Sequence, residues 1–600
     1  MAGQPVVNCG FTRRRTPYSA LLPERTLVVG RRYLFWLSIG GEEANSIEVD
    51  PQPLPAATPS NAELTVSLAV EYGPLRIVSG AEGLLRLSAE GAAVSQSPYT
   101  PRSRYSGQPG RVLFAVRAWR PGEAVLRCTI RHGLATVLET RSIRVLVTHR
   151  AHRHPGALSS IVDYRLADPD DSATIAQLPD QDGSLLLSPA TDSTHVMTVR
   201  AASGARSVEA RISLPEAAIA GAIASARNAL RTVAWGSPAP WNAKDPAHAY
   251  RYSQPASIKQ LTRDLTALAV SGYRLNFVLL SELGRRQRGT YAVAEQLREA
   301  LARPGRIQVA MLKTARHVLP MAMLYDLPFD TGATDITLCQ DFRDAYQRRD
   351  RAAQARCFNG ACRQANERGP TVVCPGGFWG FRHSLGLPVS TAANRQPAVA
   401  LKVRTPLWLS AGVYHDFATA DSHLRDLENL TTMYLDYGKD RESTLDMLRW
   451  RRSDMVYFYC HGGVGPSGVP FLRVGRGREG GVITPDNLFQ RNIGWRGSSP
   501  LVFLNGCSTA DLTPERLMDF VSFFVSDAGA CGVIGTEITV FEQLASAFAL
   551  EFFNALLCRG MSAGEATTSA RRALLTQGNP LGLCYIPFLM PDVSVHIAAS

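Results

Sequence analysis

A histidine and a cysteine, each at the end of an apolar run, are the side chains of this sequence best suited to chemistry. His461 follows DMVYFYC, and Cys507 follows PLVFLNG 46 positions later. A thiol is nucleophilic as the thiolate, so it needs a base nearby, and histidine commonly serves. If the two runs are neighbouring parallel strands, we expect the thiol and the imidazole to face each other across a shallow cleft at one sheet edge.

The residues around this pair support the same interpretation. Gly462 and Gly463 follow the histidine and would let the backbone approach a substrate carbonyl closely. We predict that the backbone N–H groups of Gly462 and Cys507 stabilise an oxyanion. Residues 508–515 read as the start of a helix, whose dipole would favour a thiolate. Either residue alone is more often structural, so the pairing carries the hypothesis.

Residues 239–600 alternate apolar runs with amphipathic stretches. The pattern predicts strands at 275–280, 307–311, 407–413, 455–460, 501–505 and 532–536, and helices at 258–270, 291–302 and 424–436. Strands that are apolar on both faces and separated by helices indicate an α/β domain with a mostly parallel sheet, covered by helices on both faces. In such sheets, sites form beyond the carboxyl ends of the strands.

The N-terminal part has a different pattern, with short runs separated by turn residues. Within residues 1–148 we predict strands at 25–29, 33–39, 64–70, 84–89, 112–119, 124–131 and 143–147. This spacing is typical of an all-β, immunoglobulin-like sandwich, here expected to sense a signal or bind a regulatory partner. Residues 149–238 are predicted to form a β-rich connector that ends in a helix.

Four ordered stretches of the C-terminal part carry a family resemblance. They are VYFYCHGGV, GGVITPDNLF, PLVFLNGCSTA, and the segment from GACGVIGTEI to TTSARRALL. Residues of about 240 to 600 resemble a CHAT domain, a caspase-like cysteine peptidase family whose clan also holds separases and gingipains. The resemblance implies a caspase-like fold, with His461 and Cys507 as the catalytic pair. The chain departs from the family pattern at Gly506 and at Glu537-Ile538, where relatives often have a small Ala or Ser and a Trp.

The resemblance also implies a function. CHAT relatives are endopeptidases, and bacterial members frequently act in immunity and regulated cell death, including the cleavage of gasdermins. We therefore expect a bacterial cysteine endopeptidase that cleaves a protein substrate, for example a gasdermin-like pore former, in antiviral defence or programmed cell death. The alternative is a catalytically silent, caspase-like scaffold that binds a partner protein.

The family often places an acidic group in the pocket for the residue before the scissile bond. Glu537 and Glu542 are the best-placed candidates in this sequence, and Asp511 is the third. Two alternatives stay open: these carboxylates stabilise helix N-termini, or the pocket is apolar.

A second group of residues that could do chemistry is a set of four cysteines: Cys339, Cys357, Cys362 and Cys374. Four thiols can bind zinc, but these spacings match only one half of a usual zinc ribbon. We expect ordinary buried thiols and no cofactor, with structural zinc as the alternative. Residues 374–383, rich in aromatics and glycine, are expected to anchor a long loop, and residues 475–480 to form a turn at the rim of the cleft.

The composition of the chain limits the classes of protein to which it can belong. With 45% hydrophobic and 19% charged residues the chain is globular. Its net charge of +12 is scattered, which argues against specific nucleic-acid binding. We find no membrane-spanning run and no leader-like N-terminus, and the eleven cysteines lack a disulfide pattern. We therefore expect a cytoplasmic protein that does not bind membranes.

Overall fold

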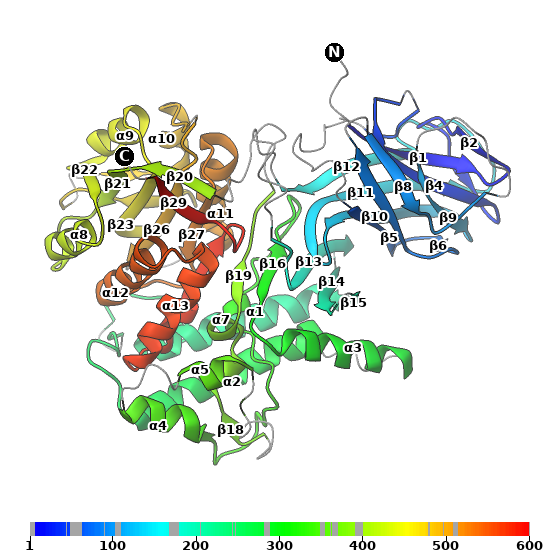
Figure 1. Ribbon diagram of the computed structural model, residues 1–600. Coiled ribbons are helices and arrows are strands. Elements are labelled where there is room, and N and C mark those ends of the chain that lie inside the picture. Colours follow the sequence, from blue (N-terminus) through cyan, green and yellow to red (C-terminus); the bar gives the residue numbers. More distant parts are fainter. Residues whose placement is uncertain are drawn as a thin grey trace.

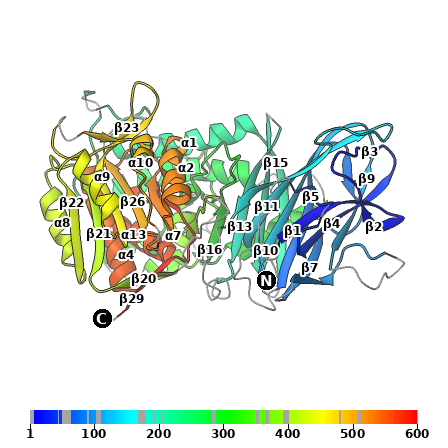
Figure 2. The ribbon, with the colours of Figure 1, turned by 90° about the horizontal axis from the view of Figure 1, so that it is seen from above.

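The molecule has an N-terminal β-rich part and a C-terminal α/β part, with another sheet between them (Figure 2). The computed structural model describes residues 6–43, 45–48, 63–88, 91–101, 110–166, 179–191, 193–204, 206–242, 244–245, 248–280, 288–348, 354–360, 362, 370–390, 400–477, 481–495, 497–507 and 514–598. Among the helices of these segments, none combines the length and the apolar character needed to cross a bilayer.

Two sheets form the N-terminal part. The first has the order β2 (Thr16–Ala20), β1 (Val6–Arg13), β4 (Arg32–Gly40), β9 (Val112–Ala118) and β6 (Leu75–Ile77). The second has the order β12 (Leu158–Arg165), β11 (Thr136–Thr148), β10 (Gly122–His132), β5 (Glu63–Tyr72), β7 (Glu82–Ser88) and β8 (Gly91–Gln96), with β3 (Leu27–Val28) beside β11. The prediction of a β-rich N-terminal part is confirmed, although the second sheet extends past the predicted boundary at residue 148.

Strand β4 is buried on both of its faces. Phe35 and Leu37 point into the main core, whereas Trp36 lies on the opposite face. There the guanidinium carbon of Arg111 lies 4.0 Å from the Trp36 ring centroid. Alternate residues of β4 therefore enter two separate buried clusters, one on each face of the strand.

The middle sheet joins segments that are far apart in the sequence. Its order is β15 (Arg206–Pro215), β14 (Thr194–Ser203), β13 (Gly183–Thr191), β16 (Arg306–Ala310) and β19 (Ser384–Gly386). The first three strands are antiparallel, whereas β13, β16 and β19 are parallel. Because this sheet takes strands from both sides of residue 238, that predicted boundary does not separate two folding units.

Two long helices, α1 (Glu216–Trp235) and α2 (Ile258–Leu280), pack beside each other below this sheet (Figure 1). The predicted strand at 275–280 is wrong, because those residues complete α2. The helix keeps its buried face to the end, since Leu268, Leu275 and Leu279 are all buried at helical spacing. Helix α3 (Arg288–Leu301) matches the prediction to within a few residues.

The C-terminal sheet is the one that positions the predicted site. Its order is β22 (Met433–Gly438), β21 (Leu407–Val413), β23 (Met455–Val464), β26 (Leu501–Cys507), β27 (Gly532–Thr536) and β28 (Tyr585–Phe588). The first five strands of this order are parallel, and β28 is antiparallel to β27. The predicted helix 424–436 is wrong in its second half, because α8 (Ala420–Glu428) is followed by strand β22.

Helices cover both faces of this sheet. On one face, the Nε2 atom of His423 in α8 lies 2.9 Å from the hydroxyl of Tyr457. On the same face, the side-chain amide of Asn505 donates to the Ala545 carbonyl in α12 (Glu542–Phe553) at 2.8 Å. Because adjacent residues of a strand point to opposite faces, the neighbours of Tyr457 and Asn505 along these strands point to the other face of the sheet.

The other face lies under α9 (Arg441–Trp450) and α11 (Pro514–Ser522) with the π-helical turn that follows it. The rings of Phe458 and Phe524 lie 6.0 Å apart, and Trp495 stacks on Phe524 at 5.8 Å. Trp495 also donates its indole N–H to the Leu448 carbonyl of α9 at 3.1 Å. The prediction of a mostly parallel, doubly covered sheet therefore describes this part of the molecule.

Smaller elements complete the C-terminal part. A hairpin of β24 (Pro470–Arg473) and β25 (Val482–Ile483) pairs with the end of β23, and β20 (Ala400–Arg404) pairs with β29 (Ser594–Ala598). Helix α10 (Pro485–Gln490) starts with a Thr484 cap, and α13 (Ala563–Thr576) starts with a Ser562–Glu565 capping box.

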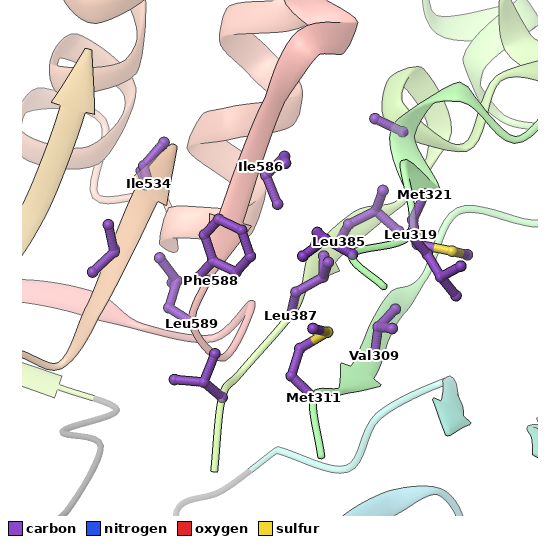
Figure 3. Close-up of a cluster of buried hydrophobic side chains, with 14 of the residues drawn as sticks. Val309, Met311, Leu319, Met321, Leu385, Leu387, Ile534, Ile586, Phe588 and Leu589 are labelled. Atoms are coloured by element: carbon purple, nitrogen blue, oxygen red, sulfur yellow. The ribbon is translucent and has the colours of Figure 1, made fainter. Parts of the chain in front are cut away.

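A shared core joins the middle sheet to the C-terminal sheet. The backbone N–H of Leu387, which directly follows β19, donates to the carbonyl of Pro587 in β28 at 2.8 Å. Figure 3 shows the apolar side chains that fill the space between β16, β19, β27 and β28: Val309, Met311, Leu319, Met321, Leu385, Leu387, Ile534, Ile586, Phe588 and Leu589. The two sheets therefore form one structural platform.

Candidate active site

Strands β23 and β26 bring the two predicted catalytic positions together. They are neighbouring parallel strands, and their register runs from Met455 opposite Leu501 to His461 opposite Cys507. Residues Met455–Cys460 of β23 are buried, whereas His461 is half-buried. The buried apolar residues thus fix the positions of both strands, and the pair His461 and Cys507 lies where β26 ends.

Aromatic rings surround His461. The imidazole centroid lies 4.5 Å from that of Tyr414 and 4.7 Å from that of Phe417, and both residues follow β21. Phe417 also packs on Tyr459, the residue two positions before His461, at 5.0 Å. Burial and the nearby Asp416 raise the pKa of Tyr414, so its hydroxyl stays protonated near neutral pH. These rings restrict the imidazole to one region at the edge of the sheet.

The backbone around Gly462 continues as a strand beyond the predicted end at residue 460. Gly462 is opposite Leu472 of β24, and the pairing extends to Val464. On the other side of β23, Gly506 lies next to Gly462, since a Cβ at position 506 would lie 3.5 Å from the Gly462 nitrogen. The two predicted oxyanion donors, Gly462 and Cys507, therefore belong to adjacent strands.

A buried hydrogen-bond network lies beneath the pair, and the sequence analysis missed it. Asn505, two positions before Cys507, donates to the Tyr457 hydroxyl at 3.0 Å and accepts from the Tyr585 hydroxyl at 2.9 Å. Nearby, burial lowers the pKa of His423 to about 4, so this histidine is neutral. The signal in the sequence was the Tyr-Phe-Tyr alternation before His461, which places Tyr457 and Tyr459 on one face.

The first predicted pocket carboxylate, Glu537, is not open to a substrate. It is 2% exposed and lies 3.0 Å from the guanidinium of Arg227 in α1. Arg227 also binds Glu515 at the start of α11 at 2.9 Å. This placement corrects the prediction that Glu537 lines the pocket: the residue belongs to an internal ion pair between α1 and the C-terminal sheet.

The Arg227 guanidinium thus pairs with two carboxylates, Glu515 and Glu537, that lie in different environments. Burial raises the pKa of Glu537 to about 7, although Arg227 works against this rise. Burial acts in the same direction on the more exposed Glu515, but there the charge and hydrogen bonds of Arg227 prevail and lower the pKa. Glu537 is therefore the member of the cluster that binds a proton near neutral pH.

The other two predicted pocket residues differ from Glu537. Glu542 is the first residue of α12, and its half-buried carboxylate accepts hydrogen bonds from the backbone N–H and the hydroxyl of Thr419. This contact fixes the segment between β21 and α8, as expected for a carboxylate at a helix N-terminus. Asp511 lies outside the described residues.

An acidic residue that the sequence analysis did not select lies between Tyr414 and Phe417, the two residues whose rings contact His461. Asp416 is exposed, follows Tyr414 by two positions, and accepts a hydrogen bond from the Gly477 N–H at 2.6 Å. Gly475 and Gly477 have φ of 78° and 55°, values that favour glycine. Gly475 also donates to the Val413 carbonyl at 2.8 Å. The described part of the predicted turn at 475–480 therefore borders the site.

The remaining predicted segments lie away from this edge. In residues 374–383, Phe378, Trp379 and Phe381 are fully buried, in agreement with an anchoring role. The four cysteines that the sequence analysis considered as zinc ligands are buried and lie in one cluster. A further cluster, absent from the sequence analysis, joins His195, Glu216 and His317 through contacts of 2.8 and 2.6 Å.

Comparisons with known proteins identify the family of this chain. The family model described as "CHAT domain" matches residues 291–581. A probable protease of Vitiosangium sp. (strain GDMCC 1.1324) is 36% identical over 611 aligned residues, which cover 99% of this chain and 78% of that protein. The separase of the Saccharomyces cerevisiae separase–securin complex aligns with a TM-score of 0.30 and 11% identity over 68% of this chain and 30% of that chain, a likeness too low to inform on function. By the family match and the relative that aligns with 99% of this chain, the chain belongs to the CHAT-domain family.

Proposed function

We propose that this chain is a cysteine endopeptidase in which Cys507 and His461 form the catalytic dyad. The pairing of these two positions in the register of β23 and β26 carries the proposal. Two positions that pair across adjacent parallel strands share a face of the sheet, and both lie at its carboxyl edge, where α/β sheets place their sites. The CHAT family and the probable protease relative support a peptidase reaction.

The reaction uses the dyad in two stages. The Cys507 thiolate bonds to the peptide carbonyl carbon, and the negative oxygen is held by the N–H groups of Gly462 and Cys507. The imidazolium of His461 then protonates the leaving amine as the C–N bond breaks. Water next attacks the thioester carbon while His461 accepts its proton, and the C–S bond breaks to release the Cys507 thiolate beside the imidazolium. Tyr414 and Phe417 keep the imidazole in place through both stages.

The biological setting of the proposal follows from the family resemblance. The substrate is a protein, such as a gasdermin-like pore former, which the peptidase activates by cleavage during bacterial defence or regulated cell death in the cytoplasm. The N-terminal β-rich part regulates or targets the peptidase. The ion pairs of Arg227 with Glu515 and Glu537 offer a physical link, because α1 directly follows the middle sheet and contacts the elements next to β26 and β27.

Cleavage assays with matched variants test the proposal. Purified full-length chain, incubated with candidate pore-forming proteins encoded beside it, should give defined fragments on a gel. Replacing Cys507 with Ala should abolish cleavage and leave the circular dichroism spectrum unchanged, whereas replacing the exposed Cys558 with Ala should leave cleavage intact. Cleavage that persists in the C507A variant would overturn the assignment. The silent scaffold predicts no cleavage in any variant and binding that survives C507A.

A further inference from the structure

Four cysteine side chains converge on one point in the segment before β19. Cys339 directly follows β17 (Thr337–Leu338), and Cys374 directly follows β18 (Val372–Val373). These two short strands are parallel neighbours, and the Cys339 N–H donates to the Val373 carbonyl at 2.9 Å. Cys357 comes from α5 (Gln354–Phe358), and Cys362 follows that helix. The fold thus assembles thiols that the sequence spreads over residues 339–374.

The distances between the sulfur atoms fit a tetrahedral metal site. The Cys339 sulfur lies 3.7 Å from that of Cys357 and 3.3 Å from that of Cys362, and all four sulfurs lie within 4.8 Å of one another. In tetrahedral zinc sites each Zn–S bond is about 2.3 Å, which places the sulfurs about 3.8 Å apart. A disulfide would instead join the sulfurs in pairs.

The cluster is closed to solvent. All four cysteines are buried, with exposed fractions from 0% to 2%. The Phe342 N–H donates to the Cys339 sulfur, a contact that supports a metal-bound thiolate. The turn after Cys374 packs so closely on α5 that a Cβ at Gly376 would lie 1.8 Å from the Cys357 carbonyl oxygen. A site without an open position holds a structural metal rather than a catalytic one.

We propose that Cys339, Cys357, Cys362 and Cys374 bind one structural zinc ion as a four-thiolate site. Binding one Zn²⁺ displaces the protons of the four thiols, which leave to solvent. The prediction of ordinary buried thiols without a cofactor is replaced by this proposal, because the structure brings together all four sulfurs and not only the pair at Cys357 and Cys362.

The proposed zinc site would stabilise the segment that precedes β19. It ties residues 337–374 to the segment that follows, where Arg382 and Trp379 both bind Asp326, at 2.9 and 3.0 Å. The carbonyls of the same segment accept hydrogen bonds from α13, including the bond from Arg572 to Phe381 at 2.7 Å. Helix α13 precedes β28, the edge strand beside β27. Zinc therefore stabilises one side of the platform that carries the C-terminal sheet.

Metal analysis of the full-length chain tests the proposal. Protein purified from zinc-supplemented medium should contain one zinc per chain, and the C357S and C374S variants should lose it. Replacing the buried Cys531 with Ser, outside the cluster, should leave the zinc in place. Replacing His195 with Ala should also leave it, which excludes the cluster of His195, Glu216 and His317 as its source.

A spectroscopic measurement covers the case in which the cysteine variants fail to fold. Wild-type chain produced with Co²⁺ in place of zinc should show thiolate-to-cobalt charge transfer and the strong visible bands of tetrahedral cobalt. An organomercurial reagent that titrates the thiols of folded wild-type protein should release one zinc per chain. Absence of these bands, titration without metal release, or bound iron in place of zinc would overturn the proposal. The C507A variant should keep its zinc, so the result does not depend on peptidase activity.

Discussion

Replacing Glu537 with Gln should remove a pH dependence of stability that the buried carboxylate creates. Burial raises the pKa of Glu537 from 4.5 to about 7 in the folded chain, with Arg227 opposing the change. Between these two values the folded state binds the proton more tightly than the unfolded state does. The stability contributed by the proton is therefore fully present below pH 4.5 and is lost as the pH rises through about 7.

The magnitude follows from the same values. One pKa unit corresponds to about 1.4 kcal/mol, so the contribution of Glu537 to the free energy of unfolding should fall by about 3 kcal/mol across this range. Denaturant unfolding followed by tryptophan fluorescence, on wild type and E537Q from about pH 4.5 to 8, gives the difference between the two proteins. E299Q, at an exposed helix position, is the control and should follow wild type.

Two results would refute this reasoning. If the difference between wild type and E537Q does not change with pH, the Glu537 carboxylate has the same pKa in the folded and unfolded states. If wild type instead gains stability relative to E537Q as the pH rises, Arg227 outweighs burial and holds the carboxylate ionised.

Two further changes test the packing around the site. Asn505→Ala leaves the Tyr457 and Tyr585 hydroxyls and the Ala545 carbonyl without this partner, and we expect a loss of about 2 to 4 kcal/mol in denaturant unfolding, whereas a loss below about 1 kcal/mol would contradict the network's role. Phe417→Leu removes a ring contact with His461 worth about 0.5 to 1.5 kcal/mol, so kcat/KM for peptide cleavage should fall about two- to tenfold with the fold retained, and unchanged kinetics would show that the ring does not position the imidazole.

The C-terminal sheet could be predicted from the sequence because its strands are short apolar runs that end at glycine or polar residues. The strands at 407–413 and 532–536 match their predicted bounds. The prediction of a strand at 275–280 failed because a short apolar segment does not by itself distinguish a strand from a buried helix. Only the wider spacing of Leu261, Leu268 and Leu275 reveals a buried helix face.

Contacts between distant segments explain what the sequence could not reveal. The parallel pairing of β13 with β16 joins residues more than a hundred positions apart, and no local pattern indicates it. The thiols of Cys339 and Cys374 could be grouped from the sequence, but only the pairing of β17 with β18 shows that they lie side by side. At the site, residue types predicted the pair His461 and Cys507, whereas the role of Glu537 depended on Arg227, a partner from a remote helix.

Identification of the residue modified by an electrophilic peptide tests the proposed dyad most directly. Full-length chain is treated with a peptide that carries a thiol-reactive group, and the labelled site is found by mass spectrometry. We predict labelling at Cys507, loss of that label in the His461→Ala variant, and little labelling at Cys558, which is exposed and reports general thiol reactivity. Labelling at Cys558 without Cys507, or a Cys507 label that persists unchanged without His461, would contradict a catalytic pair at this sheet edge.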